Sequence, residues 1–362
     1  MKILLISGIY PPDDGGPAKF MPQFATHLVS QGHQVKVITL TDEKRDKSEF
    51  QYPVKFIKRS LPRPIRMIIT TLHIFKSALR NDLIFSNGLY EETGIAVRLT
   101  RTPTLGKIVG DSVWERSRNS GKTTLTIEAF NNSKSGGFQR KLLGFALNGF
   151  SEIITPSQQL AGFVKQWGIS KPVSVIPNGV QILGMTNQSK EFDLVTVSRL
   201  VPWKNVDLLI RIVAKKNLKL CVMGDGPENL KLRTLATELN AQVTFTGALA
   251  QDKVSQQVAK AKYFVLLSTY EGMSFALLEA LGAGIPAIVS SAAGNVAVIQ
   301  NSLNGYVVDI SNEIACGDSI AEILSSASNY QKVSEGALQS VIENYSIDST
   351  LERTENKLLS LK

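Results

Sequence analysis

The stretch YFVLLSTYEGMSFALLEALGAGIPAIVS, residues 263–290, decides how this chain folds. Its first five residues form an apolar run, which predicts a buried strand over Tyr263–Leu267. A loop containing Glu271 and Gly272 follows, then a helical pattern, and Ala287–Ser290 predicts a second buried strand. A strand, a helix and a strand in this order are the repeating unit of a parallel α/β sheet.

Outward from this stretch, apolar runs and helical patterns alternate along the whole chain. A break falls near Pro177-Asn178-Gly179, which is a turn signal followed by a polar stretch to Glu191. We therefore expect an α/β protein of two Rossmann-like, doubly wound parallel-sheet domains, over residues 1–180 and 181–345. The expected strands are Lys2–Ser7, Gln34–Thr39, Val54–Phe56, Leu83–Ser86, Lys107–Val109, Glu152–Thr155, Val173–Ile176, Asp193–Ser198, Lys219–Met223, Val243–Thr246, Tyr263–Leu267, Ala287–Ser290 and Gly305–Val308.

Composition narrows the class of protein. With 43% hydrophobic residues, 362 residues can bury two cores. The two cysteines, Cys221 and Cys316, are too few for a disulfide framework or a metal cluster, and we expect buried thiols in a reducing compartment. The apolar N-terminus is interpreted as a first strand and not as a signal peptide, and no apolar stretch is long enough to span a membrane.

Positive charge is concentrated in the first half of the chain. The net charge is +9, but residues 1–182 hold 24 Lys and Arg against 13 Asp and Glu, whereas the remainder is slightly acidic. The first half is therefore expected to face an anionic partner. No nucleic-acid-binding motif is present, so an anionic membrane surface is the better candidate.

Residues 59–80 combine large apolar side chains at helical spacing with several cations. This pattern fits a helix that lies on an anionic bilayer. It fits an amphipathic helix that faces the protein core slightly better. The sequence leaves both interpretations open.

Glu271 and Glu279 are the candidate functional residues of the opening stretch. Eight residues separate them, so Glu271 is expected in the loop and Glu279 one to two turns into the helix, with both able to face one cleft. Glu279 lies among leucines and alanines, a setting that does not suit a surface acid. The unpaired N–H groups of the first helical turn are suited to binding an anion. Carboxylates for sugar hydroxyls beside amides for phosphate suit a nucleotide-sugar.

This segment resembles the retaining family-4 type of glycosyltransferase with the GT-B fold. That family carries two glutamates separated by seven residues, followed by Ala and a Gly-x-Pro; here these are Glu271, Glu279, Ala280 and Gly284-Ile285-Pro286. The resemblance covers the whole chain. It implies a donor cleft between two domains, a nucleotide-sugar donor, no metal and no cofactor, and a last helix, about 345–362, that packs back on the first domain.

In the second domain, Arg199 directly follows a predicted strand and Lys204 lies five residues further on. Ligands of open α/β sheets bind at such strand ends, and two cations suit a diphosphate that gains charge as its bond to the sugar breaks. The pair is similar to the family's diphosphate-binding pair. The resemblance also implies that Glu271 contacts the donor sugar and that Glu279 holds the ribose. The backbone around Gly247 would read the base, and Gly272, Met273, Ser274 and Phe275 would offer amides.

In the first domain, Gly15 and Gly16 precede a predicted helix and let bare amides approach phosphate or sugar oxygens. The resemblance places this loop opposite the donor diphosphate. Many relatives carry a histidine after a first-domain strand, where this chain has Asp111. Asp111 is predicted either to orient the acceptor hydroxyl or to cap the next turn, and the two are weighed evenly.

The expected function is transfer of a hexose-type sugar from a nucleoside-diphosphate donor to an acceptor hydroxyl, with catalysis by Glu271, Arg199, Lys204 and Asp111. The basic first domain favours a lipid-linked or membrane-surface saccharide acceptor, as in polysaccharide synthesis. We expect a cytoplasmic protein, peripheral on the inner face of the cell membrane. A nucleotide-sugar epimerase of the same fold, or a non-catalytic nucleotide-sugar binder, are the alternatives.

Overall fold

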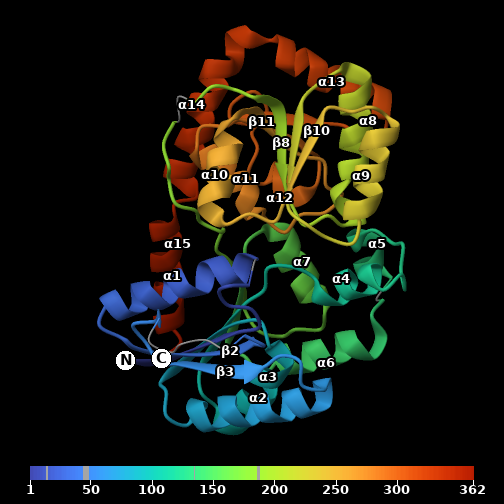
Figure 1. Cartoon of the computed structure of the whole chain (residues 1–362). Coiled ribbons are helices and arrows are strands. Elements are labelled where there is room, and N and C mark those ends of the chain that lie inside the picture. Colours follow the sequence, from blue (N-terminus) through green and yellow to red (C-terminus); the bar gives the residue numbers. More distant parts are fainter. Residues whose placement is uncertain (14, 44–48, 134, 186–187) are drawn as a thin grey trace. The chain divides into compact units, whose positions relative to one another are not determined.

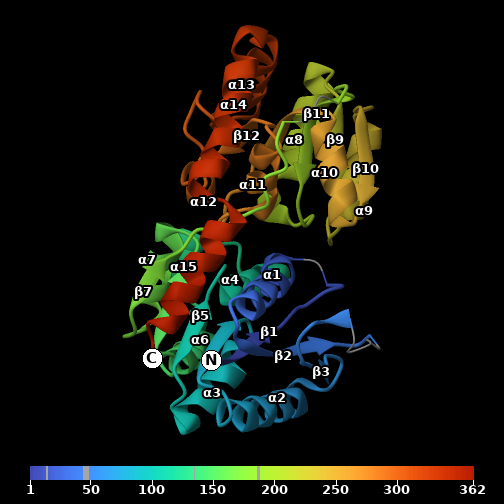
Figure 2. The same cartoon turned by 90° about the vertical axis from the view of Figure 1, so that its left-hand side faces the viewer.

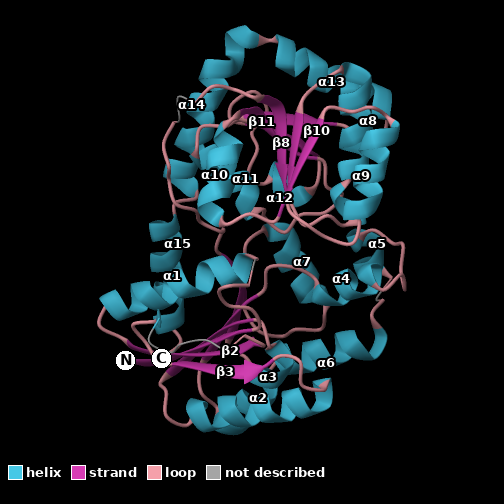
Figure 3. Cartoon of the chain, viewed as in Figure 1, coloured by secondary structure: helices cyan, strands magenta, loops and turns pink. Residues whose placement is uncertain are grey.

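A computed structural model describes residues 1–13, 15–43, 49–133, 135–185 and 188–362. The chain divides into two compact units, Met1–Pro177 with Asp348–Lys362, and Asn178–Ile347. Each unit contains one parallel β-sheet covered by helices, which confirms the predicted fold class (Figures 1 and 3).

The first unit holds a seven-stranded sheet in the order β3-β2-β1-β4-β5-β6-β7. Helices α2, α3 and α6 lie on the opposite side of this sheet from α1 (Figures 1 and 2). The strands are β1 (Lys2–Ser7), β2 (Gln34–Thr41), β3 (Val54–Lys58), β4 (Leu83–Asn87), β5 (Thr104–Lys107), β6 (Glu152–Thr155) and β7 (Val173–Val175). The helices are α1 (Gly16–Ser30), α2 (Arg63–Ala78), α3 (Tyr90–Thr100), α4 (Ser112–Asn119), α5 (Ile127–Asn132), α6 (Gly137–Leu147), α7 (Gln158–Gln166) and α15 (Ile347–Leu359).

One predicted strand was misplaced. We expected Lys107–Val109, but β5 ends at Lys107 and begins at Thr104. Thr104, Leu105 and Gly106 follow a proline and look like a turn in sequence. Gly106 is needed within the strand because an added Cβ would lie 2.5 Å from the ring of Phe150.

Helix α15 returns from the end of the second unit to the first. The carboxylate of Glu355 on this helix is hydrogen-bonded to two histidines. Its Oε2 lies 2.7 Å from His27 Nε2 and its Oε1 lies 3.0 Å from His33 Nε2. Lys357 adds an ion pair with Glu152 on β6 at 2.8 Å. Two of the three histidines therefore fasten a distant segment of chain to α1 and the start of β2.

The second unit holds a six-stranded sheet in the order β10-β9-β8-β11-β12-β13. Its strands are β8 (Phe192–Val197), β9 (Leu220–Met223), β10 (Val243–Gly247), β11 (Ala261–Leu266), β12 (Ala287–Ser290) and β13 (Gly305–Val308). Its helical segments are η2 (Pro202–Lys204), α8 (Val206–Lys216), α9 (Asn229–Glu238), α10 (Gln251–Ala259), α11 (Phe275–Gly282), α12 (Ala293–Val296), α13 (Glu313–Ser325) and α14 (Ala327–Asn344). The opening stretch of sequence forms β11, α11 and β12, and Leu277, Leu278 and Leu281 of α11 are fully buried.

Candidate functional site

Lys204 and Glu271 meet at the carboxyl end of the second sheet. Lys204 ends η2 after β8, and Glu271 lies in the loop after β11. The ammonium donates to Glu271 Oε1, which also accepts from the Ser268 hydroxyl at 2.6 Å. The side chains are 15% and 8% exposed. A nearly buried cation and carboxylate, 67 residues apart in sequence, are thus held together at the sheet edge where open α/β folds bind ligands.

Backbone contacts fix the two loops against each other. Thr269 N donates to the carbonyl of Trp203 at 2.9 Å, and Asn205 Nδ2 donates to the carbonyl of Leu267 at 2.8 Å. Asn205 has a positive φ of 51°, a conformation that asparagine tolerates better than most residues. The position of Lys204 is therefore set by contacts on both sides of it, which suits a preorganised site.

Arg199 lies just beyond β8 and is exposed. Within the described ranges its guanidinium has no hydrogen bond or ion pair. An unengaged arginine fork next to a strand end is able to bind phosphate oxygens without first breaking an internal contact. The predicted cation pair therefore consists of one engaged lysine and one available arginine.

The loop Gly272–Ser274 leads into α11. Ser274 is the N-cap, and its hydroxyl accepts from Leu277 N at 3.3 Å. Asn178 supports this loop, because its Nδ2 donates to the carbonyl of Met273 at 3.1 Å. In the sequence, Asn178 is recognisable only as part of a turn, because it stands between proline and glycine, and nothing there indicates its contact with Met273.

Glycines join the ends of β8, β9 and β10. An added Cβ at Gly224 would lie 2.0 Å from the carbonyl oxygen of Ser198, and one at Gly226 would lie 2.4 Å from that of Leu200. Gly224 N donates to Gly247 O at 2.9 Å. The glycine-containing turn after β9 is therefore required by close backbone packing beside Arg199, and Gly247 lies at the same strand ends.

Glu279 lines a small hollow with Ala276 of its own helix, Val197 at the end of β8, and Ser255 and Val258 of α10. Arg199, Lys204 and Glu271 are not among the described residues that line it. The structure thus brings Lys204 and Glu271 together and places Glu279 in a neighbouring hollow of the same unit. That one ligand contacts both the Lys204–Glu271 pair and Glu279 stays a prediction.

Gly15 and Gly16 begin α1 in the first unit. Gly15 is the N-cap with φ 135°, a conformation open mainly to glycine, and the first turn carries no acid. Asp13, just before it, forms an ion pair with Arg59 at 2.8 Å between Oδ1 and Nη1. Among the described residues, the first turn of α1 therefore carries no acid and Asp13 is paired, which suits an anion-binding turn. Asp14 lies outside the described residues.

Asp111 has the capping role that the sequence left open. Its side chain is fully buried. Oδ1 accepts from Val113 N and Trp114 N at the start of α4, and Oδ2 accepts from Arg140 Nη2 at 2.6 Å. A carboxylate committed to these contacts is poorly placed to receive a proton from an acceptor, so the geometry argues against a catalytic role for Asp111.

Two further polar residues at the carboxyl end of the first sheet were missed. Lys107 and Asn87 are buried at the ends of β5 and β4, and Lys107 Nζ and both side-chain polar atoms of Asn87 have no hydrogen bond within the described structure. Lys107 Nζ lies 3.9 Å from the ring centroid of Phe20. Burial lowers the pKa of Lys107 to about 7. The only signal in the sequence was a lysine directly after an apolar-glycine pair.

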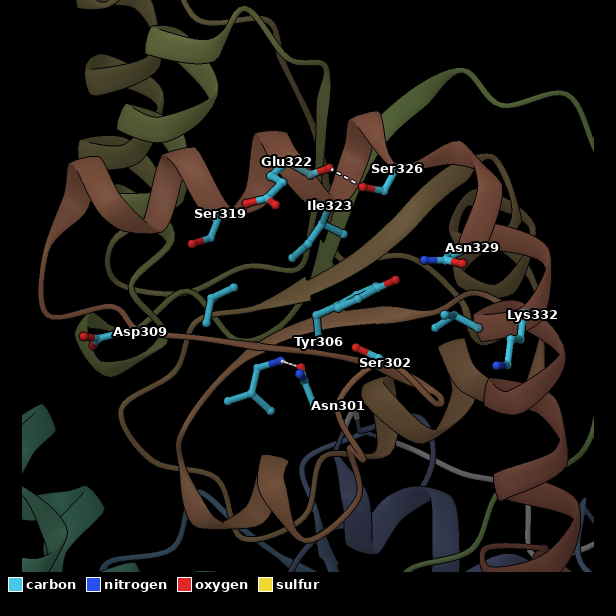
Figure 4. Close-up of a pocket in the computed structure, with 13 residues that line it drawn as sticks. Asn301, Ser302, Tyr306, Asp309, Ser319, Glu322, Ile323, Ser326, Asn329 and Lys332 are labelled. Atoms are coloured by element: carbon cyan, nitrogen blue, oxygen red, sulfur yellow. Dashed lines mark hydrogen bonds between the residues drawn. The ribbon is translucent and has the colours of Figure 1, made fainter.

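A larger hollow of about 460 Å³ lies elsewhere in the second unit, between β13 and the helices α13 and α14. Figure 4 shows Tyr306 at its centre, with Glu322 and Ser326 on one side and Asn301 and Ser302 on the other. None of the predicted site residues lines it. It is therefore not the site built around Lys204 and Glu271.

No helix among the described residues is both long and apolar enough to cross a bilayer. Nor do they contain a group of three or more His, Cys, Asp or Glu side chains that could hold a metal ion.

Family models match both halves of the chain. Residues 14–182 match the model described as Glycosyltransferase Family 4, and residues 185–340 match Glycosyl transferases group 1. Together with the two parallel sheets, these matches support a glycosyltransferase of the GT-B class.

Individual relatives are distant. N-acetyl-alpha-D-glucosaminyl L-malate synthase of Bacillus anthracis is 30% identical over 142 residues, 39% of this chain and 37% of the relative. The GtfA subunit of a UDP-N-acetylglucosamine–peptide N-acetylglucosaminyltransferase of Streptococcus agalactiae is 26% identical over 315 residues, 84% of this chain and 58% of the relative. The matched regions thus span well under two thirds of these curated relatives.

Solved structures share the fold. The crystal structure of HepE of Anabaena, in complex with UDP and glucose, has a TM-score of 0.82 with 19% identity, covering 99% of this chain and 100% of HepE. At this identity the similarity concerns the fold alone, and the substrate must be argued from this chain's own residues.

Proposed function

We propose that this protein is a retaining glycosyltransferase that moves a hexose-type sugar from a nucleoside-diphosphate donor to an acceptor hydroxyl. The observation that carries the proposal is the Lys204–Glu271 pair at the carboxyl end of a parallel sheet, where Arg199 also follows a strand with its guanidinium available. The family matches and the UDP and glucose bound by HepE support the choice of donor.

The residues divide into two roles. Arg199 and Lys204 neutralise the diphosphate as its bond to the sugar breaks, which stabilises charge that develops only in the transition state. Glu271 accepts hydrogen bonds from sugar hydroxyls, and its contact with Lys204 holds it in place. Gly272–Phe275 offer backbone amides at the start of α11, Gly247 lies beside the base, and Glu279 holds the ribose. Gly15 and Gly16 offer further amides from the first unit.

Retention at the sugar carbon follows from front-side attack. The acceptor hydroxyl attacks on the face that the diphosphate leaves, and the departing phosphate oxygen takes the proton. Glu271, the carboxylate proposed to face the sugar, is engaged by two donors, Lys204 and Ser268, and is therefore poorly suited to act as a nucleophile. A phosphate-assisted route requires no protein nucleophile and no metal ion.

The acceptor is proposed to be a lipid-linked or membrane-surface saccharide, because the first 182 residues carry 11 more basic than acidic side chains. Such an acceptor places the enzyme in the cytoplasm, peripheral on the inner face of the cell membrane. A nucleotide-sugar epimerase is the alternative, since a similar sheet edge could hold its substrate.

Binding of the donor is tested by thermal shift with a panel of UDP-, GDP- and ADP-sugars, because a ligand that binds the folded state raises its melting temperature. Arg199→Ala should abolish the shift for the preferred donor. Lys332→Ala, an exposed lysine that lines the hollow of Figure 4, is the matched control and should keep it. A shift lost in the Lys332 variant and kept in the Arg199 variant would place the donor in the other hollow.

Product analysis then separates the activities. A transferase releases the nucleoside diphosphate slowly without an acceptor and rapidly with one. If it is retaining, the sugar in the product keeps the anomeric configuration that it had in the donor. Conversion of one nucleotide-sugar into another without acceptor would identify an epimerase. Binding with neither reaction would identify a non-catalytic binder.

A further inference from the structure

Helix α2 leaves many of its large aliphatic side chains exposed. Its buried residues are Ile74 and the small or polar residues Thr70, Ser77 and Ala78, and Lys36 of β2 donates to the Ser77 hydroxyl at 3.0 Å. Core-facing helical stripes normally carry the large aliphatic residues. The sequence slightly favoured a core-facing helix, and the structure shows that much of its apolar surface points outward instead.

Exposed large aliphatic residues form a row along α2. Ile65, Ile68, Leu72 and, directly after the helix, Leu79 are 49%, 62%, 52% and 63% exposed. Successive gaps of three, four and seven residues place them on one side of the helix. Such a row is unusual, because exposed large aliphatic residues on a soluble domain are normally scattered singly.

Neighbouring helices extend the stripe into a surface. Figures 1 and 2 show α3 and α6 on the same side of the sheet as α2. Leu99 of α3, and Phe138 and Phe145 of α6, are 71%, 78% and 53% exposed. Seven of the seventeen exposed large hydrophobic residues in the described chain therefore lie on these three helices or directly after α2.

The charges on this surface are mostly positive, with Asp82, exposed two residues after Arg80, as an acid at its edge. Helices α2 and α6 contain no Asp or Glu, and the acids of α3 are in its first turn. Exposed cations stand beside the apolar residues; they are Arg63, Lys76, Arg80, Arg98, Arg101 and Lys141. We refer to the outward sides of α2, α3 and α6, with these residues, as the basic-apolar face.

We propose that the basic-apolar face is a docking surface for an anionic lipid bilayer. Cations near a negatively charged headgroup layer attract the protein, and aliphatic side chains between them enter the acyl boundary. A second copy of the chain fits less well, because an isologous contact would bring like charges together. A nucleic acid would engage the cations but leaves Ile68 and Leu72 without apolar partners.

The docking surface is coupled to the loop before α1. Arg66, in the first turn of α2, donates to the carbonyl of Arg59 at 2.8 Å, and Arg59 holds Asp13, two residues before Gly15. Helix α2 also starts after β3, at the carboxyl end of the sheet. When the protein is docked by this face, a lipid-linked acceptor would thus reach the same end of the first sheet that carries Gly15 and Gly16. Delivery of an acceptor in this way rests on the proposed function, but binding of the face to lipid does not.

The test is co-sedimentation of the full chain with vesicles of phosphatidylcholine containing phosphatidylglycerol, and with vesicles of phosphatidylcholine alone, without donor or acceptor. We expect binding only to the anionic vesicles and weakening by salt. The double variant Ile68→Gln, Leu72→Gln should lower the partition coefficient about tenfold or more, because two aliphatic side chains no longer enter the bilayer. Leu230→Gln, 79% exposed on α9 of the second unit, is the matched control and should bind as the unaltered chain does.

A second pair of variants tests the charge. Lys76→Gln with Arg80→Gln should also reduce binding, by about 30-fold, since each cation near an anionic surface contributes about 1 kcal/mol. Lys165→Gln, exposed on α7 of the same unit, should not. Circular dichroism confirms that each variant is folded.

Three results would overturn the proposal. Equal binding to both vesicle types would remove the electrostatic argument. Loss of binding in the charge variants but not in the Ile68, Leu72 variant, with competition by duplex DNA, would favour a nucleic acid. The third result is a free protein that sediments as a dimer, with the Ile68, Leu72 double variant sedimenting as a monomer but binding vesicles unchanged. It would show that the face binds a second copy of the chain. Failure of the transferase assay with vesicle binding intact would refute the proposed function alone.

Discussion

Lys204 and Arg199 are both assigned to the diphosphate, but the structure predicts that their removal will differ. Lys204→Ala leaves Glu271 with 8% exposure and without its cation, whereas Arg199 is exposed and engages nothing in the described structure. Removing one member of a fully buried ion pair costs about 3–5 kcal/mol. Since Lys204 keeps 15% exposure and the Ser268 hydroxyl still donates to Glu271, we expect about 2 kcal/mol here.

For a unit of this size, a loss of about 2 kcal/mol lowers the melting temperature by roughly 4–8 °C. Arg199→Ala should shift it by less than about 2 °C, because surface substitutions stay within about 0.5 kcal/mol. Turnover with saturating donor and acceptor should fall about 10²-fold or more in both variants, because each removes charge stabilisation made in the transition state.

The double variant Lys204→Met, Glu271→Gln separates stability from catalysis. It leaves no uncompensated buried charge, so the melting temperature should recover, while turnover should stay low. Differential scanning calorimetry and a coupled nucleoside-diphosphate assay measure the two quantities. An Arg199 variant with full turnover, or a Lys204 variant that is both stable and active, would refute the assignment of the pair.

Three other positions make separate predictions. Gly294→Ala should lower turnover and stability together, because an added Cβ would lie 2.2 Å from the carbonyl oxygen of Glu271; kinetics and thermal melts check this, and an unaffected enzyme would contradict the packing argument. Asp111→Asn should lower the free energy of unfolding by about 2–3 kcal/mol, since it leaves Arg140, which is 11% exposed, without its carboxylate partner. Turnover per folded molecule should be unchanged. Urea unfolding and active-site titration check these expectations, and a pH-dependent loss of kcat would restore a catalytic role. Burial lowers the pKa of Lys107 in the folded protein to about 7, so between pH 7 and the unfolded pKa the unfolded chain binds one more proton and stability rises with pH. Lys107→Met should raise the free energy of unfolding near pH 7 by a few kcal/mol and flatten this rise. Urea titrations at several pH values check this, and an unchanged pH profile would show that the lysine is hydrated.

The sequence predicted the elements of this fold well because parallel strands that are buried on both faces consist of consecutive apolar residues. Lys2–Ser7 and Ala287–Ser290 were placed to the residue. The strand Thr104–Lys107 was misplaced because Gly106 is there for Phe150, a residue 44 positions later, and no local pattern records that contact.

The candidate site was predictable where a motif carries it and not where packing decides it. Glu271 and Lys204 could each be placed at the edge of the sheet because both follow strand ends, but their contact with each other was not predicted. The capping of α4 by Asp111 could be weighed but not decided, since its partner Arg140 lies 29 residues away. The orientation of α2 was also undecided, because the period of 3.6 shows which residues share a side but not which side meets the sheet.

The attachment of α15 to the first unit has a consequence for biosynthesis. The histidine clamp on Glu355 joins residues more than 320 positions apart. During translation, α1 and β2 leave the ribosome long before α15 exists, and the whole of Asn178–Ile347 is made in between. Docking of α15 onto α1 and the start of β2 is therefore expected to be a late event, which follows synthesis of the whole second unit.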